Sequence, residues 1–265
     1  RGADLEAVEG VCACTNEGVQ VLQVLFGLVE KSLVIREERA GGLRFRLMES
    51  IREYGLELLV RAGGDEALRD AHAAWFLGLA ERLAACADGP EEPKAFATLD
   101  ADYDNLLAAV ERFHAAGAVV EELRLCSALG LYWQVRGFFT DGRRYLDRAL
   151  RDSESAGAAV RAPALRWAGV LAMEQGELAD ARVSLARSKS DYEAVPDPCG
   201  VLHVVSQQAK AHFRSGEFTQ AKEINEFLLD NPPGITPFLR AEAEMGLGAC
   251  AAREGSLDGA ARGAG

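Results

Sequence analysis

Apolar residues recur at helical spacing through the second half of the chain, in pairs of stripes that a glycine separates. In the clearest copy, Leu165 and Ala168 lie on one stripe, Ala181 and Leu185 lie on a second, and Gly176 lies between them. Residues spaced by three and four positions share one face of a helix. Glycine adopts positive φ without a Cβ clash, so the pattern predicts two helices joined by a tight turn.

The same pattern returns around four glycines, at intervals of 39, 40 and 39 residues. These predicted turn positions are Gly137, Gly176, Gly216 and Gly255. A period of this length is typical of helical repeat arrays, which bind other macromolecules along a curved surface. The alternative is an irregular helical bundle whose glycines align by chance.

These copies resemble tetratricopeptide repeats. The matching features are a small residue in the first helix, the turn glycine, an aromatic residue or leucine two positions on, and an alanine three positions further. The pitch is longer than is usual for that family and is similar to the repeat arms of large bacterial regulators. The resemblance implies about four repeats over residues 121–265, the last of them truncated.

The first 65 residues follow a different pattern. Val19 to Lys31 reads as an apolar helix, and Ser32 to Ile35 is a short β-branched run. After charged residues and the pair Gly41-Gly42, the segment from Leu43 to Leu47 alternates apolar and basic residues, which is typical of a strand in a hairpin. A helix resumes at Glu49. Its apolar stripe consists of Ile51, Tyr54, Leu58 and Leu59. Helix, hairpin and helix together predict a winged-helix domain.

Several strings of the chain resemble bacterial signal-transduction ATPases of the NB-ARC (STAND) class. Residues 28–34 and 44–54 are similar to the winged helix of that family, and residues 71–81 and 99–109 to the helical segment that follows it. The resemblance implies a mainly α fold with a small β-hairpin. We expect an N-terminally incomplete winged-helix domain at 1–64, a helical linker at 65–120 and a tetratricopeptide-like α-solenoid at 121–265.

In that family a nucleotide-binding domain precedes the winged helix. This chain contains no G-x-x-x-x-G-K-[ST] string, so it has no phosphate-cradling loop and we expect no cofactor in it. Related proteins carry Met-His-Asp where the winged helix touches bound ADP, and the aligned residues here are Leu47, Met48 and Glu49. The histidine is absent. Met48 and Glu49 are therefore the candidate contacts with an upstream ATPase domain.

The charge of the chain argues against direct binding of nucleic acid. It has 29 Lys and Arg against 41 Asp and Glu, a formal net charge of −12. Phosphate backbones attract clustered basic residues, and the apolar helix from Val19 to Lys31 has only one. Glu37 and Glu38 interrupt the arginines of the hairpin. Those arginines are Arg36, Arg39, Arg44 and Arg46.

Other compositional features predict a cytoplasmic protein that does not enter the membrane. The chain has no run of 18 apolar residues, and Arg1 to Gly10 lacks the apolar core of a signal peptide. In such a chain scattered cysteines are expected to be reduced thiols. They are Cys12, Cys14, Cys86, Cys126, Cys199 and Cys250.

Two patterns imitate metal sites. Asp100, Asp102 and Asp104 with Glu111 have the spacing of an EF-hand loop, but Asn105 occupies the position that needs glycine, and apolar residues continue a helix through the segment. We interpret the acidic residues as stabilising a helix N-terminus. Cys12-x-Cys14 has no second ligand pair for zinc. We expect no metal site and, since no catalytic residue set is supported by its surroundings, no enzyme activity.

Four aromatic residues cluster in the sequence near the first turn glycine: Tyr132, Trp133, Phe138 and Phe139. Packing in a helical core is the default interpretation. The alternative is a groove that binds a peptide.

The first functional hypothesis follows from the family resemblance. It describes a non-catalytic region of a signal-transduction ATPase that regulates transcription, in which the repeat arm senses a protein or small-molecule effector. The chain begins directly before a helix and stops inside a repeat, so we expect a fragment of a longer protein. The second hypothesis is a stand-alone tetratricopeptide scaffold that joins two proteins.

Overall fold

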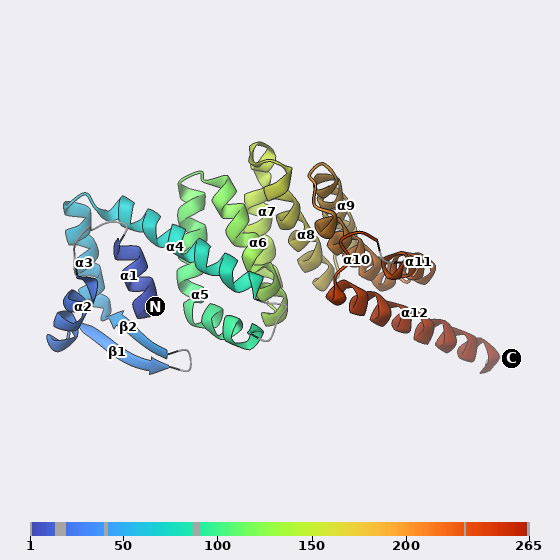
Figure 1. Cartoon of the computed structure of the whole chain (residues 1–265), viewed down its shortest axis with the longest axis horizontal. Helices are drawn as coiled ribbons and strands as arrows, with labels where there is room; N and C mark the ends of the chain where they lie inside the picture. Colours follow the sequence, from blue (N-terminus) through green and yellow to red (C-terminus); the bar gives the residue numbers. More distant parts are fainter. Residues whose placement is uncertain (1, 14–19, 40–41, 87–90, 231, 264–265) are drawn as a thin grey trace. The chain divides into compact units, whose positions relative to one another are not determined.

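A computed structural model describes residues 2–13, 20–39, 42–86, 91–230 and 232–263, with residues 39 and 254–263 described by their backbone alone. The chain divides into two compact units, residues 1–132 and 133–265. The expected mainly helical fold with one small antiparallel hairpin is confirmed, consistent with a winged helix followed by a helical solenoid (Figure 1). Val19, Gly41 and Cys14 lie outside the described residues.

The first unit begins with two short helices, a hairpin and three longer helices. Its elements are α1 (Leu5–Ala13), α2 (Val21–Glu30), β1 (Val34–Arg39), β2 (Gly42–Leu47), α3 (Glu49–Arg61), α4 (Asp65–Ala85) and α5 (Glu92–Ala115). Helix α6 (Val119–Arg136) contains the boundary between the units.

In the hairpin, β1 and β2 pair in antiparallel register, with Val34 opposite Leu47 and Arg36 opposite Phe45. Ala3 adds an isolated bridge on the other side of β2: its N–H donates to the Phe45 carbonyl at 3.1 Å, and the Phe45 N–H donates to the Ala3 carbonyl at 2.8 Å. The start of the chain is thereby fixed to the hairpin.

The predicted first strand, Ser32–Ile35, is placed too early. Ser32 has a φ of 57°, which belongs to a turn, and β1 runs on through the charged residues as far as Arg39. Those charges fit a strand because they have partners across the hairpin: Arg46 contacts Glu37 at 2.8 Å. Charge was therefore a poor signal of a loop at this position.

The small core of the hairpin region consists of Leu25, Val34 and Phe45, with residues of α1 and α2 packed against it. Helix α3 lies where it was predicted, but it contains no buried residue among those described. Tyr54, on its predicted apolar stripe, is 58% exposed. The apolar face of α3 is thus a surface in this chain.

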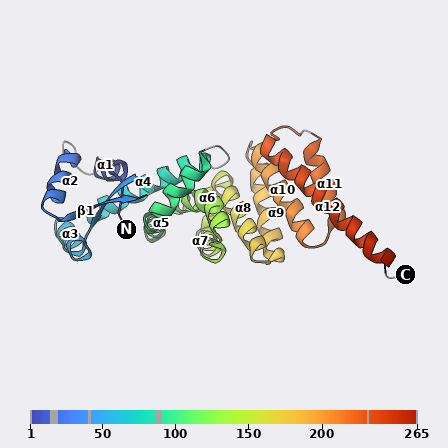
Figure 2. The ribbon, with the colours of Figure 1, turned by 90° about the horizontal axis from the view of Figure 1, so that it is seen from below.

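The second unit consists of consecutive helices that pack as neighbours (Figure 2). Its elements are α7 (Phe139–Arg151), a short 3-10 helix (Ser153–Ala156), α8 (Ala158–Glu174), α9 (Leu178–Glu193), α10 (Pro198–Arg214), α11 (Phe218–Leu229) and α12 (Pro237–Gly263). Close approach of α8 and α9 depends on Gly169, where a Cβ would lie 2.8 Å from the Leu185 side chain.

Three of the four predicted turn glycines lie between helices with positive φ: Gly137 at 75°, Gly176 at 82° and Gly216 at 78°. The prediction for Gly255 is wrong, because this residue lies inside α12. The segment 256–265 offers one large apolar side chain, Leu257, so this segment itself has little apolar surface to pack against α12. When α12 continues through Gly255, the backbone groups around this glycine keep their helical hydrogen bonds.

Candidate functional site

Two strings that lie far apart in the sequence meet at a buried ion pair in the first unit. Arg44, on β2, donates from Nη1 to Asp102 Oδ2 at 3.0 Å and from Nη2 to Asp102 Oδ1 at 2.5 Å. The two side chains are only 9% and 1% exposed. Hydrogen bonding to Asp102 raises the pKa of Arg44 against the opposing effect of burial. This two-bond geometry fixes direction as well as distance.

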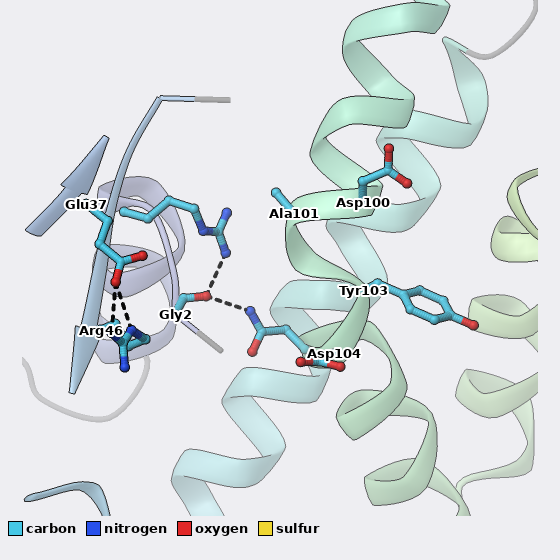
Figure 3. A pocket seen from close by; sticks show the side chains of 9 residues that line it. Gly2, Glu37, Arg46, Asp100, Ala101, Tyr103 and Asp104 are labelled. Atoms are coloured by element: carbon cyan, nitrogen blue, oxygen red, sulfur yellow. Dashed lines mark hydrogen bonds and ion pairs between the residues drawn. The ribbon is translucent and has the colours of Figure 1, made fainter. Parts of the chain in front are cut away.

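The ion pair belongs to a larger network that includes the backbone. Asn105, one turn along α5 from Asp102, donates to Asp102 Oδ1 at 2.8 Å and to the Gly2 carbonyl at 3.0 Å. Arg44 Nη2 also donates to the Gly2 carbonyl, at 2.6 Å. Figure 3 shows Gly2 between the hairpin and α5, with two hydrogen bonds reaching its carbonyl oxygen. The network therefore joins residue 2, β2 and α5.

The interpretation of the acidic run as an N-terminal helix cap is wrong. Helix α5 begins at Glu92, so Asp100, Asp102 and Asp104 lie in its middle. Asp102 is buried against Arg44, and Asp100 accepts a hydrogen bond from the Tyr132 hydroxyl at 2.9 Å. Local sequence pattern carries no signal of these roles, because the partner of Asp102 lies 58 residues away.

His72 lies on α4 beside the same network. Its ring is 4.6 Å from the ring of Phe76, centroid to centroid. Burial lowers the pKa of His72, while a hydrogen bond with Asn105 and the charge of Asp102 oppose that effect. Burial is the largest of these effects, so the neutral imidazole is favoured.

A polar hollow of about 270 Å³ adjoins the ion pair. Its walls carry Arg44, Arg46 and Glu37 from the hairpin, and Asp104 and Asn105 from α5. Figure 3 shows Glu37 and Arg46 on the hairpin side, joined by hydrogen bonds. Side chains of both signs line this hollow, two arginines and three carboxylates, so it has no strong preference for an anion or a cation.

A larger, mainly apolar cavity of about 760 Å³ adjoins the hollow and shares Gly2, Arg46 and Asn105 with its lining. Its apolar lining consists of Ala3, Val8, Leu25, Leu28, Val34, Phe45 and Leu47. Of the two candidate nucleotide-domain contacts, Glu49 lines the cavity and forms an ion pair with Arg52, whereas Met48 does not line it and is exposed. A cavity of this size and lining suits apolar side chains.

The four aromatic residues near the first turn are divided between the units. Tyr132 is buried in the first unit, 5.3 Å from the ring of Tyr103. Trp133 is buried in the second unit, where it stacks on Tyr145 at 6.0 Å. Phe138 is exposed, and Phe139 is half-buried. Two of the four are thus core residues, which leaves Phe138 and Phe139 with accessible surface.

A groove of about 270 Å³ lies between α10 and α12 in the second unit. Glu242 crosses it with hydrogen bonds from Ser206 at 2.7 Å and from Lys210 at 2.5 Å. Phe213 lines the groove, and Met245 is 69% exposed at it. No motif in the sequence singled out these residues, because the groove is formed by helices that lie about 35 positions apart along the chain.

One ion pair recurs between successive helical pairs of the second unit. Arg143, six residues after the turn glycine Gly137, contacts Glu177 at 2.9 Å. Arg182, six residues after Gly176, contacts Glu217 at 2.5 Å. In each pair the glutamate directly follows the next turn glycine. Hydrogen bonds from Arg182 and then His212 lower the pKa of Glu217. The repeat in sequence is therefore also a repeat of contacts.

Among the described residues, no group of three or more His, Cys, Asp or Glu could hold a metal ion. The acidic run of α5 belongs to these described residues, whereas Cys14 does not. In the same part of the chain, no helix is both long and apolar enough to cross a membrane.

The fold is that of a helical array preceded by a small hairpin module, with no family model that matches the chain. Over 172 residues the chain is 34% identical to proteins named as candidate HTH-type transcriptional regulators, Mb0914c of Mycobacterium bovis and Rv0890c of Mycobacterium tuberculosis. The match covers 62% of this chain and 19% of each relative. The chain thus spans about a fifth of the length of these curated relatives.

Proposed function

We propose that this chain is a non-catalytic regulatory region of a transcriptional regulator. The observation that carries the proposal is the 34% identity to proteins named as candidate HTH-type transcriptional regulators. The match extends over 62% of this chain but over only 19% of each relative. A segment of that kind is expected to control the output of a larger protein. Within the proposal, the second unit binds a protein or small-molecule effector through its exposed groove residues.

The proposed control acts on an ATPase domain of the NB-ARC class elsewhere in the same protein. Three features support this part: the family strings, the exposed apolar face of α3, and the apolar cavity with Glu49 in its wall. An exposed apolar patch of a regulatory module is a surface suited to contact with another domain. Effector binding would then shift an equilibrium between inactive and active states of the whole protein.

Calorimetry tests directly whether this chain binds ATP by itself. ATP with Mg²⁺ titrated into the 265-residue chain is expected to give no binding heat, because the chain has no phosphate-cradling loop. A dissociation constant in the micromolar range would contradict the proposal. The matching positive test is the gene sequence that encodes the residues before Arg1, in which a G-x-x-x-x-G-K-[ST] string is expected.

A stand-alone scaffold is the second candidate function, and the groove between α10 and α12 favours it equally. The two candidates differ in what binding at the arm does. A scaffold holds two proteins together and changes no ATPase, whereas the regulatory region changes the ATP hydrolysis rate of the whole protein when its effector binds. Absence of any ATPase sequence in the same gene would favour the scaffold.

A further inference from the structure

We propose that the network of Arg44, Asp102 and Asn105 is a latch that holds the hairpin module onto the linker helices, and that its release frees this module as a unit. The hairpin module is defined as residues 2–64, and the linker helices are α4 and α5. The inference concerns motion within the first unit, so it does not depend on an ATPase being present.

The hairpin module contacts the linker helices through α1 as well as through the latch. Helix α1 packs on α4, where Gly10 lies so close to Trp75 that an added Cβ would lie 2.0 Å from the indole ring. The apolar core built on Leu25, Val34 and Phe45 contains no residue of α4 or α5. The latch connects β2 itself to α5.

A buried ion pair favours either a closed latch or an open one over intermediate positions of β2. Burying two charges costs desolvation energy that only good geometry offsets, so the pair stabilises one position of β2 and tolerates little displacement. Both Arg44 and Asn105 line the polar hollow of about 270 Å³. Once the pair separates, water in that hollow can solvate the guanidinium without entering the apolar core.

A pair of glycines provides a hinge at the far end of the module. Gly63 has a φ of 70° and joins α3 to α4 together with Gly64. A Cβ at Gly63 would meet nothing within 4 Å, so the turn is not enclosed by neighbouring side chains. Rotation at a hinge of one or two residues is the usual way in which a module moves as a rigid body.

Hydrogen exchange measured by mass spectrometry on the full 265-residue chain tests the latch. In Arg44→Met and Asp102→Asn, amides of residues 2–4 and of β1 and β2 are expected to exchange at least about tenfold faster, because Gly2 and β2 lose the hydrogen bonds that connect them to Arg44, Asp102 and Asn105. The amides of α5 and of α8 to α11 should keep their protection. Arg46→Met is the matched control: Arg46 contacts Glu37 within the hairpin, so its replacement should raise exchange clearly less than Arg44→Met does.

Two results would overturn the proposal. Unchanged exchange in β1 and β2 of Arg44→Met would show that the pair does not hold the module. Equal loss of protection in α4 and α5 would show that it is a contact of the whole unit and not a latch. If Arg44→Met does not fold, Arg44→Lys keeps the charge but loses the two-bond geometry, and the same selective increase in β1 and β2 exchange is expected.

Discussion

Single residues decide how closely the elements of this protein approach one another. Gly169, Gly142 and Gly10 each lie where a Cβ would overlap a neighbouring side chain, whereas Gly137, Gly176 and Gly216 adopt positive φ at turns. The sequence pattern identified the second set, because it repeats. In the first set, Gly169 matches the small residue of the first repeat helix, whereas Gly142 and Gly10 have no sequence signature, since the neighbour that excludes a Cβ comes from another helix.

Replacement of Gly142 by alanine is expected to destabilise the second unit by about 1–3 kcal/mol. The new Cβ would lie 2.7 Å from the ring of Trp133, which is completely buried, and 2.8 Å from Leu171. Urea unfolding measures the change. Gly248→Ala in α12 is the matched control: nothing lies within 4 Å of its Cβ position, so alanine should stabilise the helix by up to about 1 kcal/mol. Equal effects of the two substitutions would contradict the packing argument.

The lowered pKa of His72 predicts that the folding stability of the first unit depends on pH. Its pKa is lowered in the folded protein by burial, so the unfolded chain binds a proton more readily. The stabilising effect is complete above the unfolded pKa of about 6.5 and is lost as the pH falls through the lower folded value. Thermal unfolding between pH 8 and pH 5 should show this loss in the wild type and a smaller loss in His72→Gln. The same loss in both proteins would rule out His72 as its source.

At the scale of elements, the sequence predicted the kinds of helix and strand better than their partners. The second strand and α3 lie where expected, and the turns at Gly137, Gly176 and Gly216 separate helices. The errors share one cause. The charges of β1, the acidic run of α5 and the apolar stripe of α3 were interpreted from local pattern, but their roles depend on what lies opposite them in space.

The repeated arginine–glutamate contacts predict unequal effects of equivalent substitutions. Arg143 is 14% exposed and contacts Asp147, Glu177 and Asp180, whereas Arg182 is 40% exposed. Arg143→Met should therefore destabilise the second unit by about 1 kcal/mol, as expected for a network and not an isolated surface pair. Arg182→Met should have a measurably smaller effect in the same urea titration. The reverse order would mean that these pairs do not connect the helical pairs as described.

At the scale of the whole molecule, acidic charge is concentrated in the first unit. Residues 1–132 contain 13 Lys and Arg against 23 Asp and Glu, and residues 133–265 contain 16 against 18. The hairpin region, where a winged helix would contact DNA, thus belongs to the unit with a formal net charge of −10. This distribution supports the expectation that this chain does not bind nucleic acid directly.

The chain alone is therefore expected not to bind duplex DNA at about 0.15 M salt, because phosphate binding requires clustered basic residues. A mobility-shift assay with random-sequence duplex measures this, with a basic DNA-binding protein as positive control. Submicromolar binding that weakens steeply with salt would contradict the expectation and would point to the arginines of the hairpin.

The sequence by itself determined the local structure: helical stripes, turn glycines, the alternating strand and the absence of a phosphate-binding string. Such features depend on residues within a few positions of one another, so their physical causes are written in the local pattern. The tertiary structure alone decided that Arg44 meets Asp102, that Gly255 continues a helix, and that the face of α3 stays exposed. Each of these depends on the desolvation and packing of groups from distant parts of the chain, which no local pattern specifies.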